Sequence, residues 1–130
     1  MYMAQPRFGA ARARYQSVDL ASRIEGASPH ALVAILFEEL LKSLDAMSAA
    51  WARKDYGQRG TRQARALSIL HGLESSLDVE NGGDIAQSLG AVYREARRLV
   101  IAACRDNDPE MVTRARTMLA EISSAWDALR

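Results

Sequence analysis

Few residues capable of catalysis or metal binding occur in this sequence, and they do not cluster. The 130-residue chain has two histidines, His30 and His71, and one cysteine, Cys104. A di-iron site in a helical bundle needs a Glu three residues before each His, and those positions hold Ala27 and Ser68. A zinc site needs about four Cys and His ligands in close spacing. The sequence therefore predicts no metal site and no cofactor.

The acidic segment 78–84 invites comparison with a calcium-binding loop. In an EF-hand register that starts at Asp78, the fifth position is Gly82 and the twelfth is Leu89. Both positions supply oxygen ligands in a working loop, so we interpret the segment as a turn. No glycine-rich stretch leads into the Lys-Ser/Thr pair of a phosphate-binding loop. Because no set of polar residues converges, the chain is not expected to be an enzyme.

The charge of the chain is balanced. It has 17 Lys and Arg residues against 16 Asp and Glu residues, a net charge of +1. Proteins that bind nucleic acid through its phosphates usually have a much stronger basic bias. Arg94, Arg97 and Arg98 form a basic turn, but acidic residues are interleaved with such turns, which is typical of a solvated helix face. A nucleic-acid binder is therefore a less favoured alternative, and no nucleic acid is expected as the partner.

A reducing compartment suits the chain. The lone Cys104 cannot form an internal disulfide. Residues 1–13 contain arginines but no apolar core of a signal peptide. No run approaches the roughly 18 apolar residues of a membrane span. We expect a cytoplasmic protein without membrane insertion.

Apolar residues recur at steps of three and four along four stretches, the period of an amphipathic helix. The first predicted helix begins with Ser28 as its cap and Pro29 at its first position, and it frays near Lys54. The fourth begins with Asp108 as its cap and Pro109 as its first residue, and it continues to the end of the sequence.

The two middle helices have less distinct ends. We expect the second to run from near Gly60 or Thr61 to about Asp78, and the third to begin around Gly83 or Asp84. The apolar stripe expected on the third helix comprises Ile85, Leu89, Val92, Tyr93, Ala96, Leu99, Val100 and Ala103.

Short connections between helices of similar length favour antiparallel neighbours. The predicted fold is all-α, an antiparallel up-down four-helix bundle over residues 28–130. Residues 1–27 are predicted to form an N-terminal arm or a short extra helix. Arg59, Arg62 and Arg65 are expected to face water.

Some apolar residues exceed what the bundle needs. Ile35 and Leu41 fall outside the stripe of the first helix. Such residues could line a groove that holds an amphipathic helix of another chain. The apolar residues of the arm, within 2–24, could occupy the same groove when the partner is absent.

Short motifs occur along nearly the whole chain, and their ordered combination is more specific than any single motif. The motifs are Met1-Tyr2, Tyr15 with Val18 to Ser22, Ser28-Pro29-His30-Ala31-Leu32-Val33, Leu36-Phe37-Glu38, Ala66-Leu67-Ser68-Ile69-Leu70, Gly72-Leu73, Ser76-Leu77-Asp78, Gly82-Gly83, Ile85-Ala86, Leu89, Tyr93, Arg97-Arg98-Leu99, Asn107-Asp108 and Ala125-Trp126. In this order they resemble the FliS family of flagellar export chaperones.

The sequence departs from the family pattern at a few positions. Glu39 stands where the family often has a glycine. Around Tyr93, the residues Val92, Glu95 and Ala96 differ from the family pattern. Arg12 lies where some members have an apolar residue.

The resemblance implies a one-to-one complex with the disordered C-terminal segment of flagellin. The segment would become partly helical when it binds the bundle. Binding would prevent premature polymerisation of flagellin, and the complex would be delivered to the export gate protein FlhA. The partner-binding residues expected are Tyr2, Tyr15, Val18 and Ile24 in the arm, and Ile35, Leu41, Leu89 and Tyr93 in the groove. A different helix-binding adaptor or regulator is the leading alternative.

Overall fold

A computed structural model describes residues 20–129 of the chain, apart from the side chains of residues 79–81. Every regular element in this range is helical, which confirms the predicted all-α fold. The elements are a short helix at 20–25, then α2 (Pro29–Ala52), α3 (Tyr56–Ser75), α4 (Val79–Arg105) and α5 (Glu110–Ala128). The chain divides between Ile35 and Leu36 into two compact units.

The first unit contains the short helix 20–25 and the start of α2. Ser28 caps α2, because its Oγ accepts a hydrogen bond from the Ala31 N–H at 3.1 Å, and Pro29 is the first helical residue. Pro suits this position because its missing N–H would have no helical partner. The predicted start of this helix is therefore confirmed. A domain boundary after residue 27 stays a prediction.

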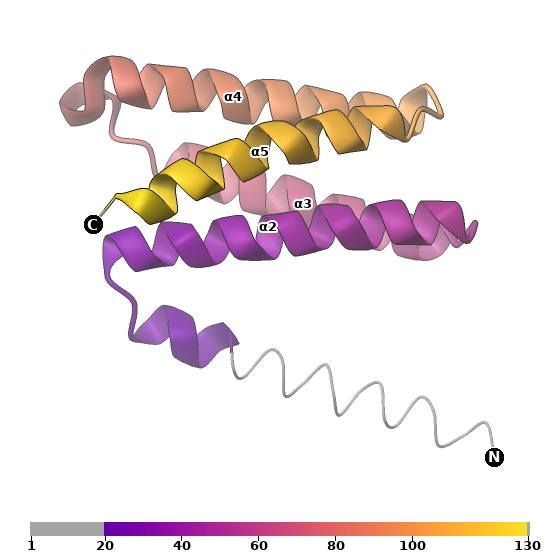
Figure 1. The fold of residues 1–130 in the computed structure, drawn as a ribbon, viewed down its shortest axis with the longest axis horizontal. Helices are drawn as coiled ribbons and strands as arrows, with labels where there is room; N and C mark the ends of the chain where they lie inside the picture. Colours follow the sequence, from indigo (N-terminus) through magenta and orange to yellow (C-terminus); the bar gives the residue numbers. More distant parts are fainter. Residues whose placement is uncertain (1–19, 130) are drawn as a thin grey trace. The chain divides into compact units, whose positions relative to one another are not determined.

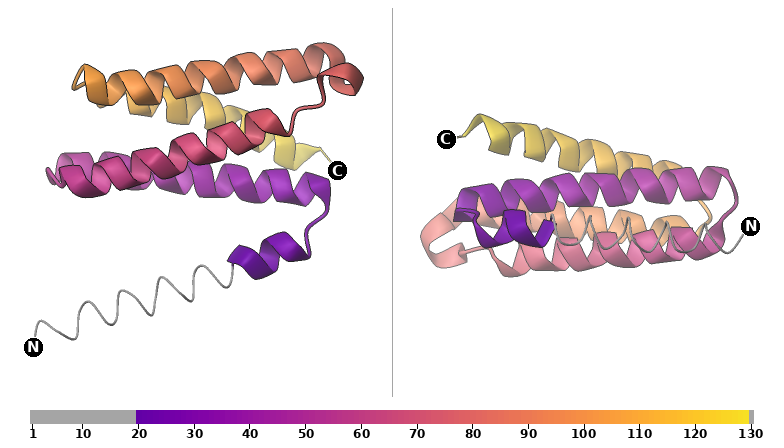
Figure 2. Two further views of the ribbon diagram at one scale, coloured as in Figure 1. Left: turned by 180° about the vertical axis from the view of Figure 1, so that it is seen from behind. Right: turned by 90° about the horizontal axis from the view of Figure 1, so that it is seen from below.

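The second unit, from Leu36 onward, is a bundle of the four long helices. Successive helices run in opposite directions, and α4 packs along both α3 and α5 (Figure 1; Figure 2). The α2–α3 and α4–α5 turns lie at one end of this unit, and the α3–α4 connection lies at the other (Figure 1). This arrangement confirms the predicted antiparallel bundle.

The α2–α3 turn is shorter than the sequence suggested. Lys54 adopts a left-handed backbone with φ 61°, and Asp55 caps α3 by accepting the Gln58 N–H at 3.1 Å. α3 therefore begins at Tyr56, and the expected start near Gly60 or Thr61 was wrong. Gly60 lies inside the helix, where a glycine lowers stability but does not by itself end the helix.

The α3–α4 connection also differs in detail from the prediction. α3 ends at Ser75 rather than near Asp78, and α4 begins at Val79 rather than at Gly83 or Asp84. The predicted break is nevertheless present as a kink inside α4, where Gly83 has φ 54° and ψ −130°. Residues other than glycine rarely adopt this conformation, so Gly83 fixes the bend.

The entry to α5 lies one residue later than predicted, because α5 begins at Glu110 and Pro109 takes the cap position, but Asp108 still contributes to it. Asp108 Oδ1 accepts a hydrogen bond from the Glu110 N–H at 3.1 Å, so its side chain satisfies one free donor of the first turn. The preceding Asn107 has a positive φ of 52°, which asparagine tolerates better than most residues. Glu110 adds a negative charge at the positive end of the helix.

The core of the second unit follows the predicted helical spacing. Its members are less than a tenth exposed and lie on all four helices; they are Phe37, Leu40, Leu44, Met47, Ala50, Ala66, Leu70, Leu73, Ala86, Tyr93, Ala96, Leu99, Val100, Ala102, Ala103, Val112, Ala115 and Leu119. Ile85 is the clear exception to the predicted stripe, because it is 74% exposed. It follows the Gly83 kink by two residues, and Ala86 beside it is buried instead.

Candidate partner-binding surface

An open pocket of about 470 Å³ lies where the end of α3 meets the first turns of α4 after the kink. Its lining mixes apolar and charged groups: Glu74, Leu77, Ala86, Gln87, Gly90 and Arg94. A pocket of this size could receive one or two side chains of a peptide rather than a whole helix. We call this feature the α3–α4 pocket.

Gly90 keeps the α3–α4 pocket open. A Cβ built at this position would lie 3.1 Å from Arg94 Nη1 and 3.4 Å from Leu77 Cδ1. The glycine therefore leaves room beside Leu77, which lies in the α3–α4 connection, at the cost of some helix stability. Gly72 on α3 has no atom within 4 Å of a built Cβ, so its lack of a side chain has no such packing reason.

One carboxylate and two guanidinium groups form the polar edge of the pocket. Glu74 Oε1 accepts a hydrogen bond from Arg97 Nη1 at 2.7 Å, and Glu74 Oε2 lies 3.5 Å from Arg94 Nη1. Two positive charges face one negative charge, so this edge is net positive. Arg94 is 57% exposed at its side chain, which leaves it available to an acidic group of a partner.

Exposed apolar surface lies close to the pocket in sequence. Ile85, adjacent to the lining residue Ala86, is one of the most exposed large apolar side chains of the described chain. A single exposed isoleucine is ordinary, but one next in sequence to a pocket with both apolar and charged lining residues makes a candidate binding surface. We therefore take the α3–α4 pocket together with Ile85 as the candidate partner-binding surface.

The arm residues expected to bind a partner are mostly outside the described range. Tyr2, Tyr15 and Val18 precede residue 20, so the structure does not place them. Ile24 lies in the short helix 20–25 and is 37% exposed. A role for these residues in partner binding stays a prediction.

The four expected groove residues do not form one open surface. Ile35 is 7% exposed and Tyr93 is 2% exposed, whereas Leu41 and Leu89 are half-buried. The expectation that Ile35 is spare was wrong, because it is buried. Leu89 directly precedes the pocket residue Gly90. Partner contact at these positions stays a prediction, and Ile35 and Tyr93 would become accessible only if their neighbours moved.

Tyr93 is part of the core of the second unit. Its ring packs against Phe37 of α2 with the ring centroids 6.2 Å apart and the planes tilted by 47°. Burial raises the pKa of the Tyr93 phenol to about 12, because the tyrosinate would lose its hydration. The hydroxyl is therefore neutral at ordinary pH and does no acid–base chemistry.

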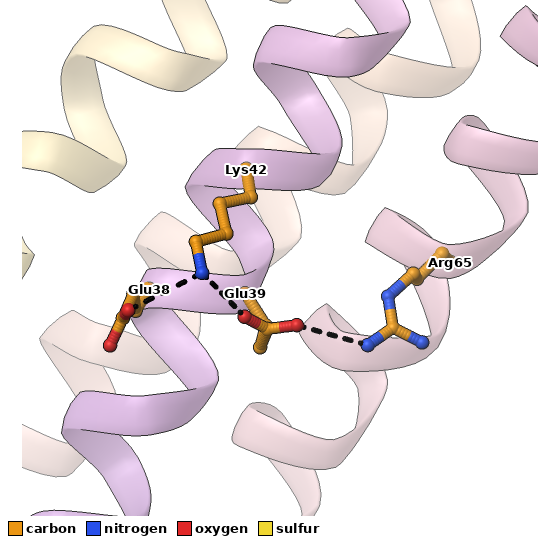
Figure 3. A network of polar contacts seen from close by, with 4 residues as sticks. All are labelled: Glu38, Glu39, Lys42 and Arg65. Atoms are coloured by element: carbon orange, nitrogen blue, oxygen red, sulfur yellow. Dashed lines mark hydrogen bonds and ion pairs between the residues drawn. The ribbon is translucent and has the colours of Figure 1, made fainter. Parts of the chain in front are cut away.

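Glu39, which departs from the family pattern, connects two helices. Its carboxylate lies 3.3 Å from Arg65 Nη2 of α3 and 3.3 Å from Lys42 Nζ, which also approaches Glu38 at 3.4 Å (Figure 3). Its hydrogen bond raises the pKa of Lys42. These pairs are exposed apart from Glu39, so each contributes little to stability, but they fix a charged face on α2 and α3.

The α3–α4 pocket was not predicted from the sequence as a site. Leu77 and Gly90 were not distinguishable from ordinary helix residues there. The one available signal was a glycine within the period of the α4 stripe, which often marks close approach of another chain or side chain.

Within residues 20–129, no group of three or more His, Cys, Asp and Glu side chains is placed to hold a metal ion. None of the described helices is long and apolar enough to cross a membrane.

Comparison with known proteins identifies the family. The family model described as flagellar protein FliS matches residues 11–130. The chain belongs to the FliS family. The flagellar secretion chaperone FliS of Vibrio cholerae is 34% identical over 115 residues, covering 88% of this chain and 85% of that protein.

Two further FliS-family relatives support the assignment. The chaperone FliSB of Pseudomonas aeruginosa is 29% identical over 89% of this chain and 92% of its own length. FliS of Salmonella typhimurium is 30% identical over 86% of this chain and 84% of its own length. The chain is therefore a flagellar secretion chaperone by family. Since FliS proteins are chaperones rather than enzymes, the predicted lack of catalytic function is confirmed.

Proposed function

We propose that this FliS-family chain binds the C-terminal segment of flagellin in the cytoplasm and prevents its premature polymerisation. The observation that supports the proposal is the α3–α4 pocket, together with the exposed Ile85 next in sequence to its lining residue Ala86. An apolar side chain of the segment would enter beside Leu77 and Gly90, while Arg94 would pair with an acidic side chain at the edge.

The mechanism follows from burial of the apolar face of flagellin. A segment that forms helical coils in the filament self-associates when that face is free. Covering the face on the chaperone removes that reaction. Because a disordered segment loses conformational entropy when it folds on binding, useful affinity needs a large wrapped area. The α3–α4 pocket would therefore be one anchor among several, with Leu41 and Leu89 as further contacts.

The arm would regulate this binding. Tyr2, Tyr15, Val18 and Ile24 would lie over part of the groove in the absence of flagellin and leave it when flagellin binds. Competition of this kind lowers the apparent affinity by the fraction of molecules that are closed. Deletion of residues 1–19 should therefore tighten flagellin binding without changing the stoichiometry.

Delivery is the second part of the proposed function. The loaded chaperone would carry flagellin to the export gate protein FlhA. Pull-down of the purified cytoplasmic domain of FlhA should be stronger with the flagellin complex than with the free chaperone. Equal recovery in both cases would remove this part of the proposal and leave flagellin binding unaffected.

Calorimetric titration with the C-terminal segment of flagellin from the same organism tests the binding step. We expect one-to-one stoichiometry and a large negative heat-capacity change, because apolar surface is buried as the segment folds. If no heat is detected at several temperatures with both components intact, flagellin is not the partner, and another helix-binding role would replace it.

A further inference from the structure

A second surface lies at the α2–α3 turn, at the other end of α3 from the α3–α4 pocket. Trp51, Tyr56 and Arg59 form it, and we call it the α2–α3 corner. The Arg59 Cζ lies 4.5 Å from the centroid of the Trp51 ring and 4.8 Å from that of the Tyr56 ring. The guanidinium is thus held against two aromatic rings, which differs from the expectation that Arg59 simply faces water.

The guanidinium donors of Arg59 have no acceptor within the described chain, although its backbone N–H donates to the Asp55 carbonyl at 3.0 Å. Its Nε is closed to solvent and has no acceptor. No carboxylate, amide or carbonyl oxygen of residues 20–129 accepts a hydrogen bond from its Nη atoms. Unlike Nε, these atoms are not buried from solvent. An arginine that is stacked on rings keeps its in-plane donors, and these match the planar geometry of a carboxylate.

The surroundings favour an acidic ligand. Arg53, Lys54 and Arg62 are exposed within a few residues of the corner. The acid of the turn, Asp55, already caps α3 and lies 3.8 Å from Arg53. One acid thus faces four basic residues, so the corner stays net positive, while Tyr56 is 54% exposed and offers apolar ring surface next to the charge.

The geometry points to a docking corner for an acidic peptide segment of a second protein partner. A Glu or Asp side chain would accept end-on hydrogen bonds from the two Nη groups of Arg59, and a neighbouring apolar side chain would cover the Tyr56 ring. A peptide with a few carboxylates fits better than nucleic acid, because the net charge of the chain is only +1. The α4–α5 connection, whose sequence includes Asp106 and Asp108, also lies at this end of the bundle (Figure 1) and would repel a long run of phosphates.

The corner is independent of the proposed flagellin site. Tyr56 begins α3 and Glu74 lies near its end, so the two surfaces are about 27 Å apart along a helix that rises about 1.5 Å per residue. A partner at the α2–α3 corner would therefore not compete with a segment in the α3–α4 pocket. The inference does not depend on flagellin being the cargo.

The test is titration of the full chain with a synthetic peptide of alternating Glu and Leu residues, followed by nitrogen-edited NMR of the arginine side chains. The Arg59 signals should shift and saturate. Arg59→Lys keeps the charge but loses the planar pair of donors, so it should weaken binding at least about tenfold. Arg62→Gln removes an exposed charge nearby and should weaken binding no more than about twofold.

Tyr56→Ala provides a second variant in case Arg59→Lys disturbs the turn, because Tyr56 is exposed and its loss should leave the helix content unchanged. It should also reduce peptide binding. Equal losses in Arg59→Lys and Arg62→Gln would overturn the proposal in favour of unspecific charge attraction. The proposal would also be overturned if the Arg59 NMR signals did not shift at saturating peptide. A single-stranded DNA oligonucleotide that binds the same residues more tightly than the peptide would overturn it as well.

Discussion

Filling the α3–α4 pocket should separate the stability of the chain from its binding activity. The proposed change is Gly90→Leu. The new Cβ would approach the flexible end of Arg94 at 3.1 Å and Leu77 Cδ1 at 3.4 Å, so the first of these neighbours can move away cheaply. The rest of the leucine side chain would occupy the space that is proposed to take an apolar side chain of flagellin.

The two expected effects have opposite signs. Replacing a glycine inside a helix by leucine stabilises the folded chain by up to about 1 kcal/mol, which raises Tm by a few degrees. Excluding one apolar side chain of flagellin from the pocket removes about 1.5–3 kcal/mol of burial. That loss corresponds to a Kd about 10–150 times weaker. Thermal unfolding and calorimetric titration measure the two effects on the same sample.

Gly72→Leu is the matched control. Gly72 lies on α3, is exposed, and has no atom within 4 Å of a built Cβ. It should gain similar stability and bind the flagellin segment as the wild type does. A Gly90→Leu chain that is folded and still binds with wild-type affinity would refute the assignment of the α3–α4 pocket to flagellin binding.

Three further predictions concern the fold. The phenol of Tyr93 has a pKa of about 12 when folded against an ordinary value of 10.0, so the unfolded chain loses this proton first as pH rises. Its stabilisation is complete below pH 10 and is lost towards pH 12, by about 3 kcal/mol in total. Denaturant unfolding should show this decline in the wild type and a smaller one in Tyr93→Phe. Phe37→Ala should lower the free energy of unfolding by about 3–5 kcal/mol, because the fully buried ring leaves a cavity; a loss below about 1 kcal/mol would contradict the packing of α2 on α4. Asp55→Ala should cost about 1 kcal/mol through the lost α3 cap, and unchanged Tm would mean that water replaces this cap at no cost.

Helix number and direction were predictable from the sequence because period and caps agreed. Ser28 and Asp108 are followed by proline, and both side chains accept the expected backbone hydrogen bonds. The start of α3 was missed because Gly60 suggested a break, although Asp55 was available as a cap. In that case the cap and the packing of the helix outweighed the low helix propensity of glycine.

The binding surface was less predictable than the fold. The exposure of a side chain depends on which helices pack against each other. A periodic stripe of apolar residues does not specify at which residue that packing ends. Ile85 fits the α4 stripe by spacing but is exposed just after the kink, while Ile35 lies off the α2 stripe and is buried. The ring contacts of Arg59 likewise depend on the tight turn at Lys54, whose backbone conformation no sequence pattern specified.

Flagellin polymerisation in the presence of the chain tests the central claim most directly. Purified flagellin would be seeded with short filaments, and elongation would be followed by light scattering with increasing amounts of wild-type chain. We predict that elongation stops near one chain per flagellin, and that Gly90→Leu requires a much higher concentration for the same effect while Gly72→Leu behaves as the wild type does. Elongation at an unchanged rate with excess wild-type chain would contradict the proposed role as a flagellin chaperone.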